Sequence, residues 1–322
     1  MLDPSALTGE PLVGHYTMVS VLDILMENSA TIDGDTRSID GNITLSGNSN
    51  IGGTPPACTG TATPGPGKAI TTQNPATVCD RQLPGETYSL AEVDPGDAAT
   101  NNHNSNICGL DPCSGGGVTL DSKYRLTING SSLTLSNSGT YFFCNLDMVG
   151  NSQLTIAPGA KVKIYIGSPE WCQANKGPQP TNVDNYGMSF SNKSIITNLN
   201  IDPTTGKPNP TYLQLYVVGS PTQCSSYPLP SPSKCSVTLG NNNTTYLMLY
   251  APHSVVQLQN NISLFGAVVG RQIVMSQQSH ITYVDSVKNV TSKELYPVFK
   301  LQGYRECTPT LPSGSTSPDA GC

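Results

Sequence analysis

The chain has 322 residues, a formal net charge of −6, 12% charged residues and 36% hydrophobic ones. This length allows one large domain or two average ones, and without any basic run the chain is not expected to bind nucleic acid or an anionic membrane surface. Gly, Pro and short polar residues fill much of the remainder; they disfavour helix interiors and suit a β-protein with many turns.

Ten cysteines in so polar a chain indicate an oxidising compartment, so we expect an extracellular or cell-surface protein. None of them has the spacing of a zinc site. Spacing alone does not fix the pairing, but bridges between neighbours are the simplest expectation: Cys58 with Cys79, Cys108 with Cys113, Cys144 with Cys172, Cys224 with Cys235, and Cys307 with Cys322. No apolar run approaches the roughly 20 residues of a membrane helix, so a membrane link would need a segment absent from this chain.

In residues 1–53 the sequence repeats itself. Residues 24–32 align without a gap on residues 43–51, an offset of nineteen, and both carry apolar residues at alternate positions. Alternation predicts strands, and a short fixed period predicts stacked repeats. We interpret these residues as the first rungs of a β-solenoid, the alternative being a hairpin or meander.

The pattern fails in residues 54–117, which contain four cysteines and several Pro-Gly or Pro-Pro turns. Loops this long are uncommon inside compact domains unless they are functional, stapled or partly disordered. We expect a cysteine-containing loop excursion or cap, with a possible strand over residues 85–93.

Alternation returns in residues 118–301, which we expect to form the main β-solenoid. Its most regular part is residues 245–285, where residues 256–261 and 273–278 repeat one strand-and-corner pattern at an offset of seventeen. Residues 167–191 look like a second loop region, and residues 302–322 like a loose tail. The expected fold is therefore mainly β, a single-stranded β-solenoid with long disulfide-stapled loops.

Two stretches of this expected stack resemble a known family. They contain Gly139-Thr140-Tyr141-Phe142-Phe143, Ala157-Pro158-Gly159, Tyr250-Ala251-Pro252-His253 and Leu264-Phe265-Gly266-Ala267-Val268-Val269-Gly270-Arg271. These motifs resemble the G-T-Y-Y-F strand, A-P-G corner, Y-A-P-N turn and F-Y-G-A-V-V-G-K rung of the β-solenoid domain of bacterial PilX-like pilus-assembly proteins. The resemblance covers roughly residues 118–285. It implies a pilus-associated or surface protein, anchored in full-length relatives by an N-terminal apolar helix that this chain lacks.

The residue types used in catalysis do not cluster in the sequence. The histidines His15, His103, His253 and His280 lie far apart, and the acids are sparse within the rungs, so we expect neither an enzyme nor a cofactor. A polysaccharide-degrading β-helix enzyme, the alternative, would need converging carboxylates. The acidic loops at residues 33–35 and 94–97 lack the spacing of calcium-binding loops, and ordinary turns explain them better.

Aromatic residues are the clearest surface feature: Tyr246, Tyr250, Tyr283 and Trp171 could form a binding surface, although packing beneath a covering loop explains them more simply. The main hypothesis is a structural head that presents loops to other pilus or cell-surface proteins. The alternative is a secreted solenoid that binds extracellular carbohydrate or ice. Ice binding would need a flat face of regularly spaced threonines, which the outward positions Gln257, Gln259, Val274 and Ser276 do not supply.

Overall fold

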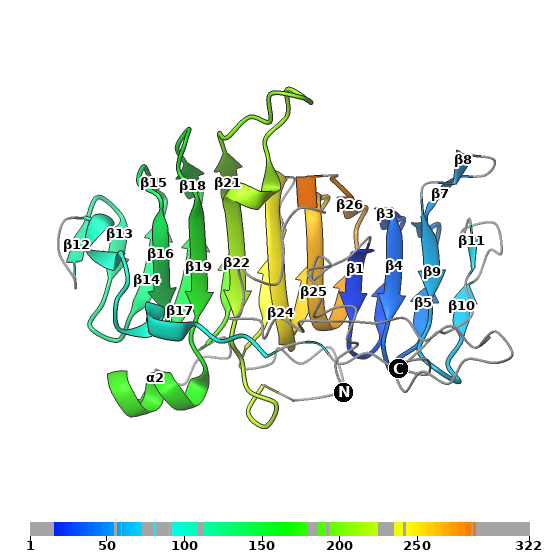
Figure 1. Cartoon of the computed structure of the whole chain (residues 1–322), viewed down its shortest axis with the longest axis horizontal. Helices are drawn as coiled ribbons and strands as arrows, with labels where there is room; N and C mark the ends of the chain where they lie inside the picture. The colour runs from blue at the N-terminus through cyan, green and yellow to red at the C-terminus, as the bar shows by residue number, and fades with distance from the viewer. Residues whose placement is uncertain are drawn as a thin grey trace, which may run out of the picture.

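The computed structural model of the chain describes residues 16–54, 57–58, 60–72, 80–81, 90, 92–108, 113–178, 186–190, 193–224, 235–240, 243–284 and 286–287. Short strands lie side by side along the long axis of an elongated body (Figure 1). The class is mainly β, as predicted.

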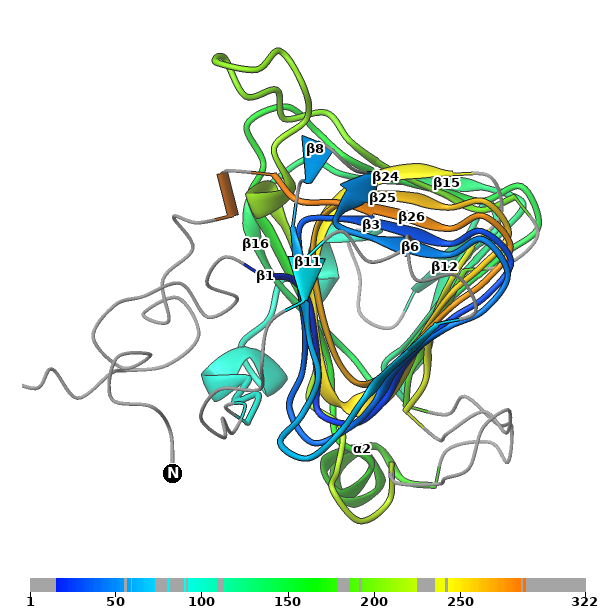
Figure 2. The ribbon, with the colours of Figure 1, turned by 90° about the vertical axis from the view of Figure 1, so that its right-hand side faces the viewer.

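Seen along that axis, the strands form three sides around one core, which we name faces A, B and C (Figure 2). Face A consists of β16 (Gly139–Phe143), β19 (Val162–Ile166), β22 (Leu213–Val217), the middle parts of β24 (Thr244–Leu258) and β25 (Ser263–Met275), β1 (Tyr16–Ser20), β4 (Asp35–Ser38), β9 (Thr61–Thr63) and β11 (Asp80–Arg81). Face B consists of β14 (Arg125–Asn129), β17 (Asn145–Val149), β20 (Met188–Phe190), β23 (Val237–Leu239), the last parts of β24 and β25, β2 (Ile24–Met26), β5 (Ile43–Leu45) and β10 (Ile70–Thr72). Face C consists of β15 (Ser132–Leu135), β18 (Gln153–Ile156), β21 (Ile195–Asn198), the first parts of β24 and β25, β26 (His280–Thr282), β3 (Thr31–Asp33) and β6 (Asn50–Ile51).

At the ends and corners lie the hairpins β7 (Gly53–Thr54) with β8 (Ala57–Cys58) and β12 (Cys113–Gly115) with β13 (Val118–Leu120), the short helix η4 (Pro210–Tyr212), and α2 (Pro169–Lys176). The short helices η2 (Gly96–Ala99) and η3 (Asn104–Asn106) lie over face A. Strand β13 pairs antiparallel with β14 and so ends the parallel stack on face B.

Neighbouring strands of a face pair in parallel and in register, as the repeats predict. Val256 lies beside Ile273, and Ile24 beside Ile43, which are the offsets of seventeen and nineteen in the sequence. Every second residue points inward, so aliphatic side chains form continuous columns that fill the core.

The layers do not stack in sequence order. Strand β25 pairs with β1 and β2, and β26 pairs with β3, so the N-terminal layers sit on the C-terminal one. In Figure 1 the blue strands accordingly lie beyond the orange ones, far from β14. Residues 54–117, expected as a loop excursion, supply β9, β10 and β11 to these layers before the chain runs back to β12. Most of residues 85–93 and the tail 302–322 lie outside the described residues.

Corners between the faces explain the polar residues of the repeat. Between faces B and C, Asn260 and Asn261 have φ of 57° and 59°, and Gln277 and Gln278 have φ of 54° and 59°. Asn adopts this left-handed conformation more readily than most residues. At a corner between faces C and A, Gly34 has φ of +124°, and a Cβ there would lie 1.9 Å from the Thr17 hydroxyl oxygen.

Candidate functional site

Face A is covered by residues 92–108, which we call the strap (Figure 1). Four outward aromatic side chains of face A are in register and buried: Phe142, Tyr165, Tyr216 and Tyr250. They pack with Val93, Ala98 and Ala99 of the strap in one apolar cluster. The Tyr165 and Tyr216 rings stack with centroids 4.9 Å apart, and burial, with the charge of Asp94, raises the pKa of Tyr165. This part of face A is therefore a second core and not a free surface.

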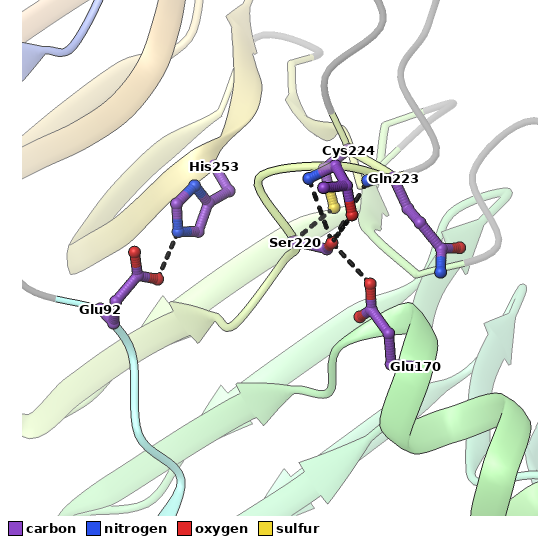
Figure 3. A network of polar contacts seen from close by, with 7 residues as sticks. Glu92, Glu170, Ser220, Gln223, Cys224 and His253 are labelled. Carbon is purple, nitrogen blue, oxygen red and sulfur yellow. Dashed lines mark hydrogen bonds and ion pairs between the residues drawn. The ribbon is translucent and has the colours of Figure 1, made fainter.

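Polar contacts hold the strap to the strands. The buried Asn104 side chain donates to the Phe142 carbonyl at 2.7 Å and accepts from the Phe142 N–H at 3.1 Å, as a neighbouring strand would. The His103 N–H donates to the Thr140 carbonyl at 2.9 Å. At the other end of the strap, Glu92 pairs with His253 (Figure 3).

The four aromatic residues predicted as a binding surface do not come together. Strand β24 bends between two faces, so Tyr246 points outward on face C while Tyr250 is buried beneath the strap on face A. Tyr283 is half-buried against the face A cluster, and Trp171 packs edge-on against Phe142 with ring centroids 4.7 Å apart. Only Tyr246 lies on a face that is open among the described residues.

The corner between faces A and B is stapled. Disulfides join Cys144 to Cys172 and Cys224 to Cys235, confirming two of the expected pairs. Cys108 is also disulfide-bonded, but the side chain of its expected partner, Cys113, lies outside the described residues, as do the side chains of Cys58 and Cys79 and all of Cys307 and Cys322.

Helix α2 occupies the same corner (Figure 2). Ser168 caps it, and its Glu170 accepts a hydrogen bond of 2.6 Å from the Ser220 hydroxyl (Figure 3). Burial raises the pKa of Glu170, but hydrogen bonds from Ser220, the Glu170 backbone, Ser168 and Gln223 outweigh it and lower that pKa. A carboxylate stabilised in its charged form is suited to anchoring a loop and not to taking up a proton at neutral pH.

Face B presents an irregular outward column. In order along the stack, its members are Thr127, Asp147, Ser189, Thr238, Gln257, Val274, Leu25, Thr44 and Thr71, so acidic, amide and aliphatic residues interrupt its threonines. The positions that lack regularly spaced threonines in the sequence, Gln257, Gln259, Val274 and Ser276, belong to face B or to its corner with face C. They therefore give no information on the strand centres of face C.

Face C presents two outward columns. In the first three layers, one column is Thr134, Thr155 and Thr197, which lie directly beside one another. The other column is Ser132, Gln153 and Ile195, two residues earlier on the same strands. In the later layers one column is Thr244, Ser263, His280, Thr31 and Asn50, and the other is Tyr246, Phe265, Thr282 and Asp33. All of these side chains are exposed or half-buried. Nine of these fifteen side chains carry a hydroxyl group, and none is Lys, Arg or Glu.

An aromatic pair lies midway along face C. The Tyr246 and Phe265 rings stack with centroids 4.7 Å apart, and the Lys207 ammonium lies 6.0 Å from the Phe265 centroid. Burial raises the pKa of Tyr246. Of this pair, Tyr246 belongs to the predicted aromatic surface, and Phe265 is its unpredicted neighbour on the next strand.

His280 joins the C-terminal layer to the N-terminal one on face C. Its ring contacts the Thr31 hydroxyl through Nδ1 and lies 3.0 Å from an Asp33 oxygen and 2.8 Å from the Thr282 hydroxyl through Nε2. These side chains come from directly paired strands, so they form a cross-strand ladder. His280 and His253 therefore have partners that the sequence separates widely.

Among the described residues, no group of three or more His, Cys, Asp or Glu is placed so that it could hold a metal ion. The carboxylate of Asp35 accepts from the Thr61 N–H and hydroxyl, and Asp94 accepts from the Gly96 N–H, which are turn and inter-layer contacts. No described helix is long and apolar enough to span a membrane.

Comparisons with known proteins give distant likeness. No family model matches the chain, and no curated protein matches it, so the PilX-like resemblance rests on its short motifs. A glycosylated ice-binding protein from an Arctic yeast is similar at 16% identity and TM-score 0.40, covering 86% of this chain and 95% of that one. An ice-binding protein from the Antarctic ascomycete Antarctomyces psychrotrophicus is similar at 13% identity and TM-score 0.38, covering 88% and 98%.

The competence-associated pilin ComZ from Thermus thermophilus is similar at 10% identity and TM-score 0.26, covering 85% of this chain and 70% of that one. Because all three TM-scores are low, we base the proposed function on the geometry of this chain.

The threonine column was missed in the sequence although a signal for it exists. Thr134 and Thr155 stand twenty-one residues apart, and Thr155 and Thr197 forty-two, each flanked by inward-facing residues. The doubled spacing reflects the insertion between β19 and β20, which includes α2.

Proposed function

We propose that this protein is an extracellular, non-enzymatic β-solenoid that uses face C to bind an ordered, uncharged surface, and that ice is the ligand this face fits best. The observation that carries the proposal is the in-register column Thr134, Thr155 and Thr197. The two disulfides support a location in an oxidising compartment.

The geometry favours a crystalline ligand because face C repeats in two directions. Parallel strands space the layers by about 4.8 Å, and outward side chains along one strand follow at about 6.7 Å. A solid with a lattice can engage such a repeat at many points at once. Each contact can then be weak while their sum is specific.

Threonine suits this task for two physical reasons. Its β-branched side chain is stiff, so little rotamer entropy is lost on binding. It also offers a methyl group beside a hydroxyl that donates and accepts hydrogen bonds. Lysine, arginine and glutamate would hold hydration water and lose more entropy, and they are missing from the described columns of face C.

Placing a charge in the middle of the threonine column tests the proposal. We expect the unmodified protein to be enriched in slowly grown ice and to produce thermal hysteresis, and Thr155→Lys to abolish most of both effects. Thr238→Lys on face B is the matched control, since Thr238 is also half-buried and points outward from a strand centre. Exclusion of the unmodified protein from ice, or equal loss in the two variants, would refute ice binding by face C.

A neutral polysaccharide is the second candidate, and the stacked Tyr246 and Phe265 rings favour it. Aromatic rings offer large, stiff apolar area next to the hydroxyl column. Sedimentation with microcrystalline cellulose or chitin tests it: retention that Phe265→Ala removes and Thr155→Lys does not would assign the aromatic pair as the main contact and replace ice as the ligand.

A pilus-associated or cell-surface head is the third candidate. Strand β1, with which the described residues begin, lies in face A in the middle of the stack, between β25 and β4. An attachment made at this strand would leave face C and both ends of the stack free for partners. Immunogold microscopy of the native cell surface tests whether the protein lies on filaments.

A further inference from the structure

We propose that the outer edge of β15 takes up an extended peptide segment of a partner protein as an additional strand of face C. β15 is the last strand of face C at the end of the stack where β12 and β13 lie (Figure 1), and it pairs on one side only, with β18. The inference does not rest on the proposed function, because it concerns backbone groups at the end of face C and not the side chains on its surface.

The backbone groups of β15 point alternately to its two sides. The Leu135 carbonyl accepts from the Ala157 N–H at 3.0 Å, on the side of β18. In a parallel ladder alternate residues direct both backbone groups to the same neighbour, so those of Ser132 and Thr134 point away from β18. No described residue forms a hydrogen bond with the N–H and C=O groups of these two residues. They therefore form an open edge that can pair with another strand.

The same end of the stack is closed on the other two faces. On face A the strap occupies the edge of β16: His103 bonds both backbone groups of Thr140, and Asn104 bonds both those of Phe142. On face B, β13 pairs antiparallel with β14. In the part of the chain that the structure describes, the edge of β15 alone lacks such a cover at this end.

The sequence of β15 does not protect this edge. Proteins usually protect edge strands with charged side chains, proline or bulges. Residues 129–138, Asn-Gly-Ser-Ser-Leu-Thr-Leu-Ser-Asn-Ser, contain neither a charged residue nor a proline, and β15 pairs with β18 without a shift of register. Such an edge is suited to strand addition, in which main-chain hydrogen bonds provide the affinity and alternate side chains the specificity.

The elements on either side of β15 favour a single added strand over a second copy of the protein. On one side β13 and β12 continue past β14, and on the other the strap lies beyond the edge of β16. A second copy would bring the same projecting elements to the interface, where they would meet those of the first copy before the two β15 edges could pair. An extended peptide has no such projections.

The columns of face C specify the side chains of the added strand. Leu133 and Leu135 are buried and lie beside Leu154 and Ile156 in the core. Thr134, between them, is exposed and points outward. An added strand would continue these columns, so apolar residues suit its inward positions and a small uncharged residue suits the position between them. The partner therefore presents an extended, uncharged segment with apolar residues at alternate positions.

Fluorescence anisotropy of the oxidised protein with a labelled synthetic peptide tests the proposal. The peptide repeats residues 131–136, Ser-Ser-Leu-Thr-Leu-Ser, which have the required alternation. The matched probe has the same composition with its two leucines adjacent, which breaks the alternation. We expect saturable binding of the alternating peptide and no binding of the matched probe.

Thr134→Pro is the decisive variant. Proline lacks the N–H that would bond the added strand, and its ring blocks the approach, while the ladder to β18 does not use the N–H of this residue. The variant should therefore show unchanged thermal unfolding and bind the peptide about tenfold or more weakly. Thr134→Ala keeps the N–H and is the matched control, with unchanged affinity. Ser132→Pro, which also removes an N–H from the open edge, takes the place of Thr134→Pro if that variant does not fold.

Three binding results would overturn the inference: no binding of the alternating peptide, equal binding of the two peptides, or equal affinity of Thr134→Pro and the unmodified protein. Sedimentation that shows a concentration-dependent dimer, abolished by Thr134→Pro, would also overturn it, because the edge would then belong to a second copy. Thr155→Lys, which tests the proposed function, should leave peptide binding unchanged, so the two proposals fail separately.

Discussion

Replacing Tyr216 tests whether the strap makes face A a second core. The ring is 2% exposed and stacks on Tyr165 on one side, with the Tyr250 ring 6.4 Å away on the other. Tyr216→Ala removes a buried aromatic ring from a site where stacked strands prevent collapse, at a cost of about 3–5 kcal/mol. For a chain of this size, that loss lowers the melting temperature by about 4–7 °C.

Tyr216→Phe separates the ring from its hydroxyl. It removes the hydrogen bond to Gln214, which is 2.8 Å long and contributes about 0.5–1.5 kcal/mol. Thr127→Ala on face B is the surface control, with an expected change within about 0.5 kcal/mol. Urea unfolding of the oxidised protein measures all three variants.

Limited proteolysis gives the second measurement, since Tyr216→Ala should also loosen the strap and speed its cleavage. If Tyr216→Ala costs no more than Tyr216→Phe and the strap is cleaved no faster, the aromatic column is not buried in solution, and the covered face A is refuted.

Three further predictions concern local contacts. The pKa of Glu170 is lowered in the folded protein, so its contribution to stability is present above the unfolded pKa and is lost as pH falls through the folded pKa. The urea midpoint of Glu170→Gln should therefore lie below that of the unmodified protein at neutral pH, and the two midpoints should converge in acid. Asn104→Ala removes two buried hydrogen bonds that tie the strap to face A and should cost about 1–3 kcal/mol and speed amide exchange in η2 and η3, while the exposed Asn101→Ala should do neither. Gly34→Ala places a Cβ against a neighbouring layer at positive φ and should lower the free energy of unfolding by about 1–3 kcal/mol or prevent folding. Gly67→Ala is the control: Gly67 also has positive φ but has open space around it, so thermal unfolding should show a smaller loss of stability.

Local sequence patterns predicted much of the fold. Alternation identified which residues point inward, and the offsets of seventeen and nineteen gave the register of Val256 beside Ile273 and of Ile24 beside Ile43. Proximity in the chain was enough to pair Cys224 with Cys235. Each of these features depends on residues within one or two turns of the chain.

The order of the layers could not be read in the same way. Every layer presents the same kind of edge, a row of unpaired backbone groups, so the pattern does not say which layers meet. Ile24 follows the repeat of Ile273 as well as that of Ile43, and the structure pairs it with both.

The layer order also explains why face A is covered while the threonine column of face C is not. Because the N-terminal layers sit beyond β25 and β26, the chain must return along the whole stack to reach β12, and the strap makes that journey over face A. The two described disulfides and α2 occupy the corner of faces A and B. Among the described residues, Thr134, Thr155 and Thr197 of face C have no such cover, and Leu133, Leu154 and Ile196 beside them point into the core. The uneven distribution of loops around a regular stack therefore leaves the threonine column exposed, which is what the proposed binding of an ordered surface requires.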